Sequence, residues 1–332
     1  MEISERKNYS DRRFLEFRHH LTQAEQISAS KACVYATGSF GRQEATPDSD
    51  LDLCIVSGIK SDDEGKNEND NPLSNLDTIC LKAELIQLTN TCNLPSFDGD
   101  GRYLKNYTIN DLTRSIGTPQ DDSNNTFTAR LLLLLESKPL VGTEVYNKSI
   151  ADVIASYWRD YEHHKNDFLP AYFANDILRL WRTFCVNYEA RRKSDSKEKS
   201  IDGRIKNFKL KHSRIITCYS ALLYLLSKHT LQNTVLPKDA IDMISMTPIE
   251  RIKWLSTQPH LSKHKLCFDD IILNYEIFLK TISKDKDELR YDFSDDEKHR
   301  TIKEEAVKFG DSIFYALNSI GENKPFHRLI VV

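Results

Sequence analysis

Two aspartates, Asp50 and Asp52, are two positions apart in the sequence, a spacing that can place two carboxylates together in a functional site. Asp50 directly precedes the segment LDLCIV and Asp52 lies within it, and the apolar residues of this segment are typical of a buried β-strand. Alternate side chains of a strand point to the same face, so the two carboxylates would lie side by side. Like charges repel at that distance unless a cation lies between them, and Mg²⁺ prefers carboxylate oxygens. The pair therefore predicts a metal site.

A glycine turn precedes this pair. Gly38 and Ser39 follow the β-prone segment VYAT, and ten residues lie between Ser39 and Asp50. A glycine at this place lets backbone N–H groups approach a phosphate, and the serine adds a hydroxyl donor. Together, the turn and the carboxylates indicate a nucleoside triphosphate that is joined to the protein through a metal ion.

The string GSFGRQEATPDSDLDL resembles the nucleotide-binding segment of the DNA polymerase β-like nucleotidyltransferase superfamily. It is most similar to the branch containing the bacterial uridylyltransferase that modifies the nitrogen-signalling protein PII. In that branch a Gly-Arg-x-Glu segment precedes Ser-Asp-x-Asp. The corresponding residues here are Gly41, Arg42, Glu44, Ser49, Asp50 and Asp52.

This resemblance implies an enzyme that transfers a nucleoside monophosphate from a triphosphate such as ATP to an acceptor, with release of pyrophosphate. Asp50 and Asp52 would hold two Mg²⁺ ions, or Mn²⁺ in their place. Gly38 and Ser39 would anchor the β and γ phosphates. Arg42 would add positive charge where negative charge develops on the leaving group.

In this superfamily a third carboxylate usually comes from a later strand. Asp98 and Asp100 are the candidates, and either would bind the catalytic metal or take the proton of the acceptor. The sequence does not decide between them, and a plain glycine-aspartate turn without metal is an equal alternative. Neither residue lies within the strand expected over residues 102–109, which departs from the pattern of the superfamily.

The composition predicts a cytoplasmic protein of two domains. The 332 residues exceed the size at which single cores usually stop growing, and 39% hydrophobic with 29% charged residues is typical of globular proteins. No apolar run approaches the ~20 residues of a membrane span, so no membrane partner is expected. The net charge of −3 leaves nucleic-acid binding to a local patch. Seven scattered cysteines without a C-x-x-C are typical of free thiols in a reducing compartment.

The strand pair and the resemblance predict an α+β fold. A small mixed β-sheet flanked by helices would form the nucleotidyltransferase core in residues 1–145. An all-helical C-terminal domain would follow in residues 146–332, where the pattern shows helical spacing. The polar stretch at residues 57–74 predicts a flexible insertion into the core.

Within the core, helices are expected over residues 10–30 and 75–89. A further helix is expected to begin with the capping residues 121–123 and to end near Ser137, before Pro139. Its Arg130 and Glu136 either face the site or only pack against the sheet.

Basic residues gather in the expected helical domain, just before an apolar run from Ile215. They can neutralise a triphosphate or hold an acceptor strand, although a charge run is more often a solvated helix face. Helical domains that follow nucleotidyltransferase cores close one side of the nucleotide cleft, and this general resemblance favours the functional interpretation. The residues concerned are Lys209, Lys211 and Arg214, with Lys206 beside them.

The acceptor stays open at this point. The uridylyltransferase branch suggests a protein, but an evident His-Asp phosphohydrolase pair and regulatory domains are missing from the sequence. A nucleic acid, such as a tRNA end, or a second nucleotide in a defence-type signalling synthase fits equally well. By analogy alone, the chain could act with a partner protein in a two-gene toxin or antiviral system. The alternative is a non-catalytic nucleotide-binding or partner-binding module derived from such an enzyme.

Overall fold

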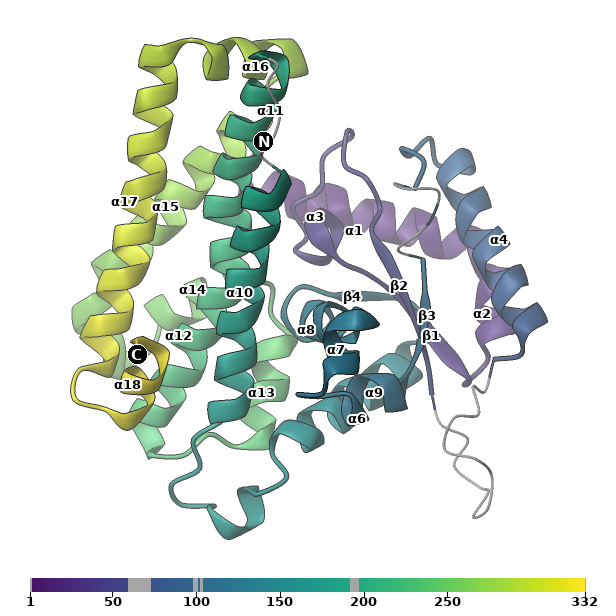
Figure 1. Cartoon of the computed structure of the whole chain (residues 1–332), viewed down its shortest axis with the longest axis horizontal. Coiled ribbons are helices and arrows are strands. Elements are labelled where there is room, and N and C mark those ends of the chain that lie inside the picture. Colours follow the sequence, from purple (N-terminus) through teal and green to yellow (C-terminus); the bar gives the residue numbers. More distant parts are fainter. Residues whose placement is uncertain (1, 59–72, 98–100, 102–103, 192–196, 332) are drawn as a thin grey trace. The chain divides into compact units, whose positions relative to one another are not determined.

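The computed structural model describes residues 2–58, 73–97, 101, 104–191 and 197–331. Contacts within the chain divide it into two compact units, residues 4–159 and residues 160–332 together with residues 1–3. The predicted α+β fold is confirmed, because the first unit carries a small mixed sheet among helices and the described part of the second is helical (Figure 1). The predicted domain boundary at residues 145/146 falls inside helix α9 (Thr143–Tyr157), and the extent of the folding domains stays a prediction.

The sheet has four strands in the order β3-β2-β1-β4. Strand β1 (Ala32–Ala36) pairs antiparallel with both β2 (Leu53–Ser57) and β4 (Lys138–Val141). Strand β3 (Asn106–Thr108) runs parallel to β2 and is shorter than the strand expected over residues 102–109. The apolar runs of β1 and β2 thus form the central pair of strands, as their sequences predict.

The central pair brings the glycine turn and the aspartates to the same end of the sheet. Ala36 is the partner of Leu53 at the last position of the β1–β2 ladder. One residue further, the Thr37 N–H donates a hydrogen bond to the Asp52 carbonyl oxygen at 2.9 Å. Because β1 ends where β2 begins, the residues after β1 and those before β2 are close neighbours.

One face of the sheet packs against α1 (Ile3–His20), α2 (Thr22–Ser28) and α4 (Asn75–Thr91), which lie together on that side in Figure 1. The single leading helix expected over residues 10–30 is wrong, because two helices occur and the first begins at Ile3. Ser10 is buried within α1, and its hydroxyl accepts a hydrogen bond from the Ala45 N–H at 3.1 Å. The Ser10 hydroxyl thus makes a tertiary contact inside the first unit.

The opposite face of the sheet is covered by α8 (Thr126–Leu135) and α9. The Tyr35 ring on β1 lies 5.9 Å from the Tyr146 ring on α9, and the Tyr35 hydroxyl donates to the Ala129 carbonyl. The helix expected over residues 121–137 is also wrong. It is two helices, α7 (Pro119–Ser123) and α8, separated by a left-handed residue at Asn125. Helix α6 (Ile109–Arg114) precedes them.

Strand β4 was not predicted. Its four residues contain Pro139, which lacks a backbone N–H and is tolerated in sheets mainly on edge strands and at bulges. The structure satisfies both conditions, because β4 is an edge strand and its pairing with β1 is irregular between Val34 and Tyr35.

The described part of the second unit consists of helices joined by short connections. None of the described helices has the length and apolar character of a membrane span. Residues 59–72 of the predicted insertion lie outside the described residues. The principal helices of the second unit are α10 (Ala171–Arg191), α11 (Lys197–Lys209), a π-helical turn (Leu210–Arg214), α12 (Ile215–Gln232), α13 (Pro237–Ile244), α14 (Pro248–Ser256), α15 (Lys265–Thr281), α16 (Lys286–Ser294), α17 (Asp296–Gly321) and α18 (Pro325–Val331).

The core of the second unit contains a buried histidine. The His212 ring stacks on Phe278 at a centroid distance of 4.5 Å and on Phe309 at 4.8 Å. Its Nδ1 lies 2.9 Å from the Phe208 carbonyl oxygen. Burial lowers the pKa of His212 to about 4, so this ring is neutral at physiological pH.

Candidate active site

Gly38 forms the turn after β1 and has the left-handed φ of +64° that favours glycine. A β-carbon built on this residue would lie 2.7 Å from Asp52 Oδ2. The Asp52 carboxylate therefore rests directly against the turn, as expected if both contact the same ligand. Gly38 also begins the short helix α3 (Gly38–Gly41).

Ser39 carries a buried polar atom that the protein does not satisfy. Its Oγ is inaccessible to solvent and has no hydrogen-bond partner among the described residues. A buried hydroxyl without a partner costs about 1–3 kcal/mol, so such groups usually have a functional or structural reason. The Ser39 hydroxyl therefore has unused hydrogen-bonding capacity next to Gly38.

Asp50 and Asp52 are exposed, whereas Leu51 and Leu53 are buried in the core of the first unit. This alternation agrees with the strand-like spacing on which the metal hypothesis rests. The turn before Asp50 is held by Ser49, whose hydroxyl accepts a hydrogen bond from the Thr46 N–H at 2.9 Å. Both carboxylates thus project from a local structure that is fixed on either side.

Cys54 lies on β2, two residues after Asp52, which directly precedes the strand. Burial raises the pKa of the Cys54 thiol to about 12, and the charge of Asp52 acts in the same direction. The Cys54 thiol is therefore neutral at physiological pH. The carboxylates of Asp50 and Asp52 offer oxygen ligands of the kind that Mg²⁺ binds.

The backbone after the turn is anchored by close packing at Gly41. A β-carbon on Gly41 would lie 2.0 Å from the Glu136 carbonyl oxygen and 2.9 Å from that of Ala36. No side chain fits there, so the glycine permits α3 to sit against the segment that joins α8 to β4. This contact explains the second glycine of GSFG.

Arg42 is buried in an ion-pair network. Its Nε donates to Glu44 Oε2 at 2.8 Å and its Nη1 to Glu136 Oε2 at 2.9 Å. Arg6 on α1 donates to the carbonyl oxygen of Glu44 at 2.7 Å. The Gly-Arg-x-Glu segment thereby fastens α3 to α1 and to Glu136, which gives Arg42 a positioning role. The carboxylate of Glu136, buried in this network, was not recognised from the sequence as its partner.

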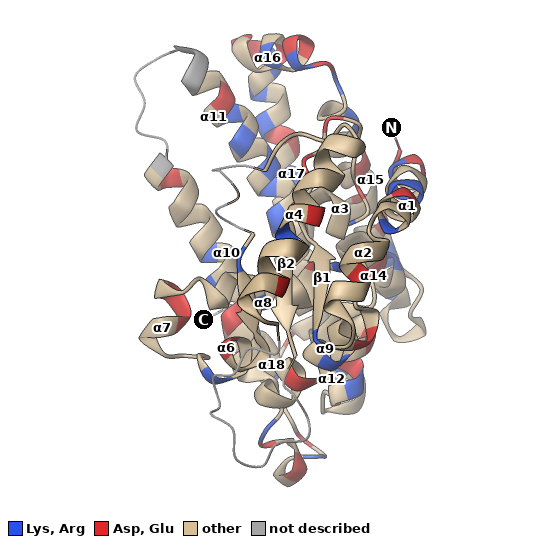
Figure 2. Ribbon diagram, turned by 90° about the vertical axis from the view of Figure 1, so that its right-hand side faces the viewer, with Lys and Arg blue, Asp and Glu red and all other residues tan. Residues whose placement is uncertain are grey.

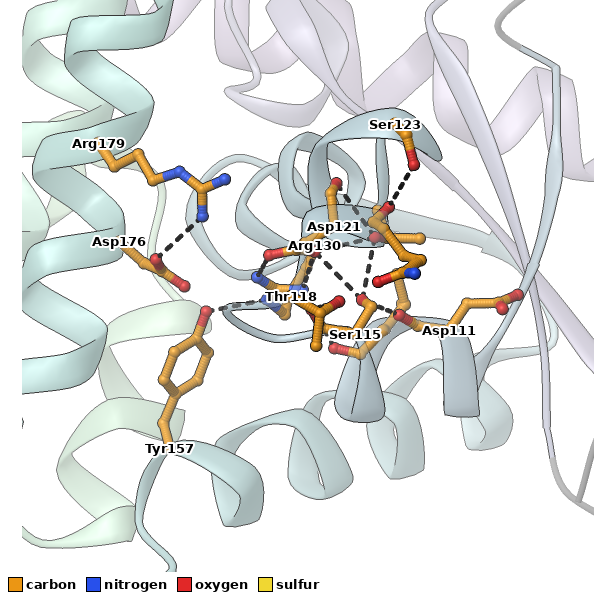
Figure 3. Close-up of polar contacts among 12 residues, drawn as sticks. Asp111, Ser115, Thr118, Asp121, Ser123, Arg130, Tyr157, Asp176 and Arg179 are labelled. Atoms are coloured by element: carbon orange, nitrogen blue, oxygen red, sulfur yellow. Dashed lines mark hydrogen bonds and ion pairs between the residues drawn. The ribbon is translucent and has the colours of Figure 1, made fainter.

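Arg130 takes part in a second buried ion pair, which Figure 3 shows in close-up. Its Nη1 and Nη2 donate to Asp121 at 2.8 and 2.7 Å, and its Nε donates to the Tyr157 hydroxyl at 2.9 Å. Both charged side chains are fully buried. Asp121 is thus the ion-pair partner of Arg130 and does not cap a helix. Through its contact with Tyr157, the pair joins α7, α8 and α9 on the face of the sheet that α8 and α9 cover.

The turn, the hydroxyl and the two carboxylates all lie within a short stretch of the first unit. Residues 18–89 match the family model of the nucleotidyltransferase domain. This match contains β1, α3 and both aspartates, and it supports transfer of a nucleoside monophosphate in general. It leaves the branch of the superfamily as a prediction. Comparisons with curated proteins and with solved structures gave no match.

The other predicted site residues fall outside this stretch of the nucleotidyltransferase domain. Asp98 and Asp100 lie outside the described residues. Lys209 is exposed at the end of α11, where Figure 2 shows basic positions along the helix. Lys211 and Arg214 are half-buried in the π-helical turn, with the Arg214 guanidinium 4.8 Å from the Phe184 ring centroid. These three residues belong to the second unit, and their role stays a prediction.

Proposed function

We propose that the protein is a nucleotidyltransferase that transfers a nucleoside monophosphate from a nucleoside triphosphate to an acceptor, with release of pyrophosphate. The observation that carries this proposal is the Asp52 carboxylate against Gly38, with the unpartnered Ser39 hydroxyl beside it. A carboxylate for a metal and a donor for a phosphate are the two groups that a metal-bound triphosphate requires. The family match at residues 18–89 supports the same reaction class.

Each residue has a defined task in this proposal. Asp50 and Asp52 bind the divalent cations, for which Mg²⁺ is the natural ion and Mn²⁺ a substitute. Bound there, the ions polarise the phosphoryl oxygens and make the acceptor hydroxyl a better nucleophile. Gly38 lets the Asp52 carboxylate lie against the turn and brings its own backbone close to the phosphates, and Ser39 Oγ donates a hydrogen bond to a phosphate oxygen.

The remaining predicted residues support the reaction in less direct ways. Arg42 holds the turn in place through Glu44 and Glu136, and its positive charge lies within the same segment. Asp98 or Asp100 supplies a third carboxylate. The basic residues of the π-helical turn and of the end of α11 bind polyanions, either the triphosphate or a nucleic-acid acceptor.

The test is incorporation from α-labelled triphosphates. The purified protein is incubated with each labelled triphosphate and Mg²⁺ or Mn²⁺, alone and with RNA, DNA or cell lysate. Label in nucleic acid, small products or protein bands identifies the acceptor class. We expect Asp50→Asn and Asp52→Asn to lower transfer at least about 100-fold, because each removes a charged metal ligand.

Asp48→Asn is the matched control. Asp48 is exposed in the same loop and undergoes the same chemical change, so its transfer rate should equal that of the wild type. Wild-type turnover by Asp52→Asn would refute the proposed metal site. Tight triphosphate binding without turnover by the wild type, under all these conditions, would show a binding module in place of an enzyme.

A further inference from the structure

A second cluster of possible metal ligands lies away from the aspartates, between α1 and the end of α4. Glu16 and His20 are one helical turn apart on α1, and Cys92 is the C-cap residue of α4. Each offers one ligand atom, and these atoms all lie within 4.8 Å of one another. We propose that Glu16, His20 and Cys92 bind a zinc ion that joins α1 to the C-terminal end of α4.

The donor set determines which metal is expected. A cysteine sulfur, an imidazole nitrogen and a carboxylate oxygen are the common ligands of Zn²⁺, whereas Mg²⁺ takes oxygen ligands and retains water. The cluster is thus chemically distinct from the pair formed by Asp50 and Asp52. Three protein ligands leave one position of a tetrahedral zinc ion for water.

The distances are compatible with a zinc ion after small side-chain movements. With Zn–S near 2.3 Å and Zn–N near 2.0–2.1 Å, two tetrahedral ligand atoms lie roughly 3.5 Å apart. The present spread therefore has to shrink by about 1 Å. His20 is exposed at the surface of its helix, and its side chain can rotate toward Cys92 without disturbing the core.

Arg13 already holds the two ligand-bearing segments together. Its Nη1 donates to Glu16 Oε2 at 2.6 Å and its Nη2 to the Cys92 carbonyl oxygen at 2.7 Å. This bridge keeps the end of α4 beside α1 before any metal binds, so little order has to be created on binding. The carboxyl end of α4 also carries the partial negative charge of the helix dipole, which favours a cation near Cys92.

The experiment uses the full chain, freed of metal with a chelator and titrated with Co²⁺ as a spectroscopic probe for Zn²⁺. We expect one equivalent of Co²⁺ to give a thiolate-to-metal charge-transfer band that Zn²⁺ abolishes by displacement. Cys92→Ser should remove the band. His20→Ala changes an exposed residue and should fold normally, yet it should weaken Zn²⁺ binding at least about 100-fold.

Two neighbouring residues provide matched controls. His19 adjoins His20, and Cys80 is an exposed cysteine of α4, so His19→Ala and Cys80→Ser should retain both the band and the affinity. Asp52→Asn should also retain them, which separates this site from the proposed catalytic metals. A wild type without the band would overturn the proposal. So would a band that survives Cys92→Ser, or an equal loss of affinity in His19→Ala and His20→Ala.

Discussion

The Asp52 carboxylate occupies the position that a side chain of residue 38 would fill. With φ at +64° and a β-carbon 2.7 Å from Asp52 Oδ2, Gly38→Ala introduces backbone strain and displaces the carboxylate. We expect the free energy of unfolding to fall by about 1–2 kcal/mol and nucleotidyl transfer to fall at least tenfold. Chemical denaturation and the labelled-triphosphate assay measure the two effects.

Gly310→Ala serves as the control for that substitution. Gly310 lies inside α17 and has open space where a β-carbon would be, so alanine should be neutral or stabilising by up to about 1 kcal/mol. If Gly38→Ala behaved in the same way, the packing of Asp52 against the turn would have no energetic consequence.

The Ser39 hydroxyl allows function to be separated from stability. Because its oxygen is buried without a partner, Ser39→Ala should leave the free energy of unfolding unchanged or raise it by about 1 kcal/mol. Transfer should decline through a higher KM for the triphosphate. Ser10→Ala makes the same change where the hydroxyl accepts the Ala45 N–H, and it should cost about 1–3 kcal/mol without that rise in KM. An equal loss of stability in both variants would contradict the assignment.

The ion pairs of Arg42 should be important for stability. Arg42→Met removes the guanidinium that pairs with the buried carboxylates of Glu44 and Glu136, and removing one partner of a buried pair typically costs about 3–5 kcal/mol. We expect a loss of about that size for the first unit, seen in denaturant titrations. Arg204→Met breaks the more exposed pair with Asp296 and should cost less than about 1 kcal/mol. Comparable losses would mean that the network is not the anchor of α3.

His212 predicts a dependence of stability on pH. The unfolded histidine titrates near 6.5 and the folded one near 4, so the unfolded state holds more protons between these values. Stability is therefore complete above pH 6.5 and falls by about 3 kcal/mol as the pH drops to 4. Denaturation measured from pH 7 to pH 4 should show this slope, and His212→Phe should flatten it. The exposed His163→Phe should leave the slope intact.

The sequence predicts the centre of the first unit well because its signals are local. Apolar runs bounded by glycine predict β1 and β2, and their antiparallel pairing brings Gly38 to Asp52. Helix α4 was also predicted, and its N-cap residue Ser74 forms a capping box with Asp77. Each of these features depends on residues only a few positions apart.

The remaining features depend on partners far apart in the chain. Asp121 has the appearance of a helix cap, but burial beside Arg130 makes it half of an ion pair. The pairing of Arg42 with Glu136 likewise becomes visible only when α3 meets the end of α8, and a contact of Arg42 with phosphate stays a prediction. The spacing of residues along the sequence does not reveal which side chains are buried together.

The composition of strand β4 affects the tendency of the protein to aggregate. An edge strand offers unpaired backbone groups to which another chain can add a strand, and such addition leads to aggregates. Here the edge is only four residues long, one of them is a proline without an N–H, and a lysine carries charge beside it. Addition of a strand from another chain to the β4 edge is therefore disfavoured. Aggregation through this edge should be rare even at high protein concentration.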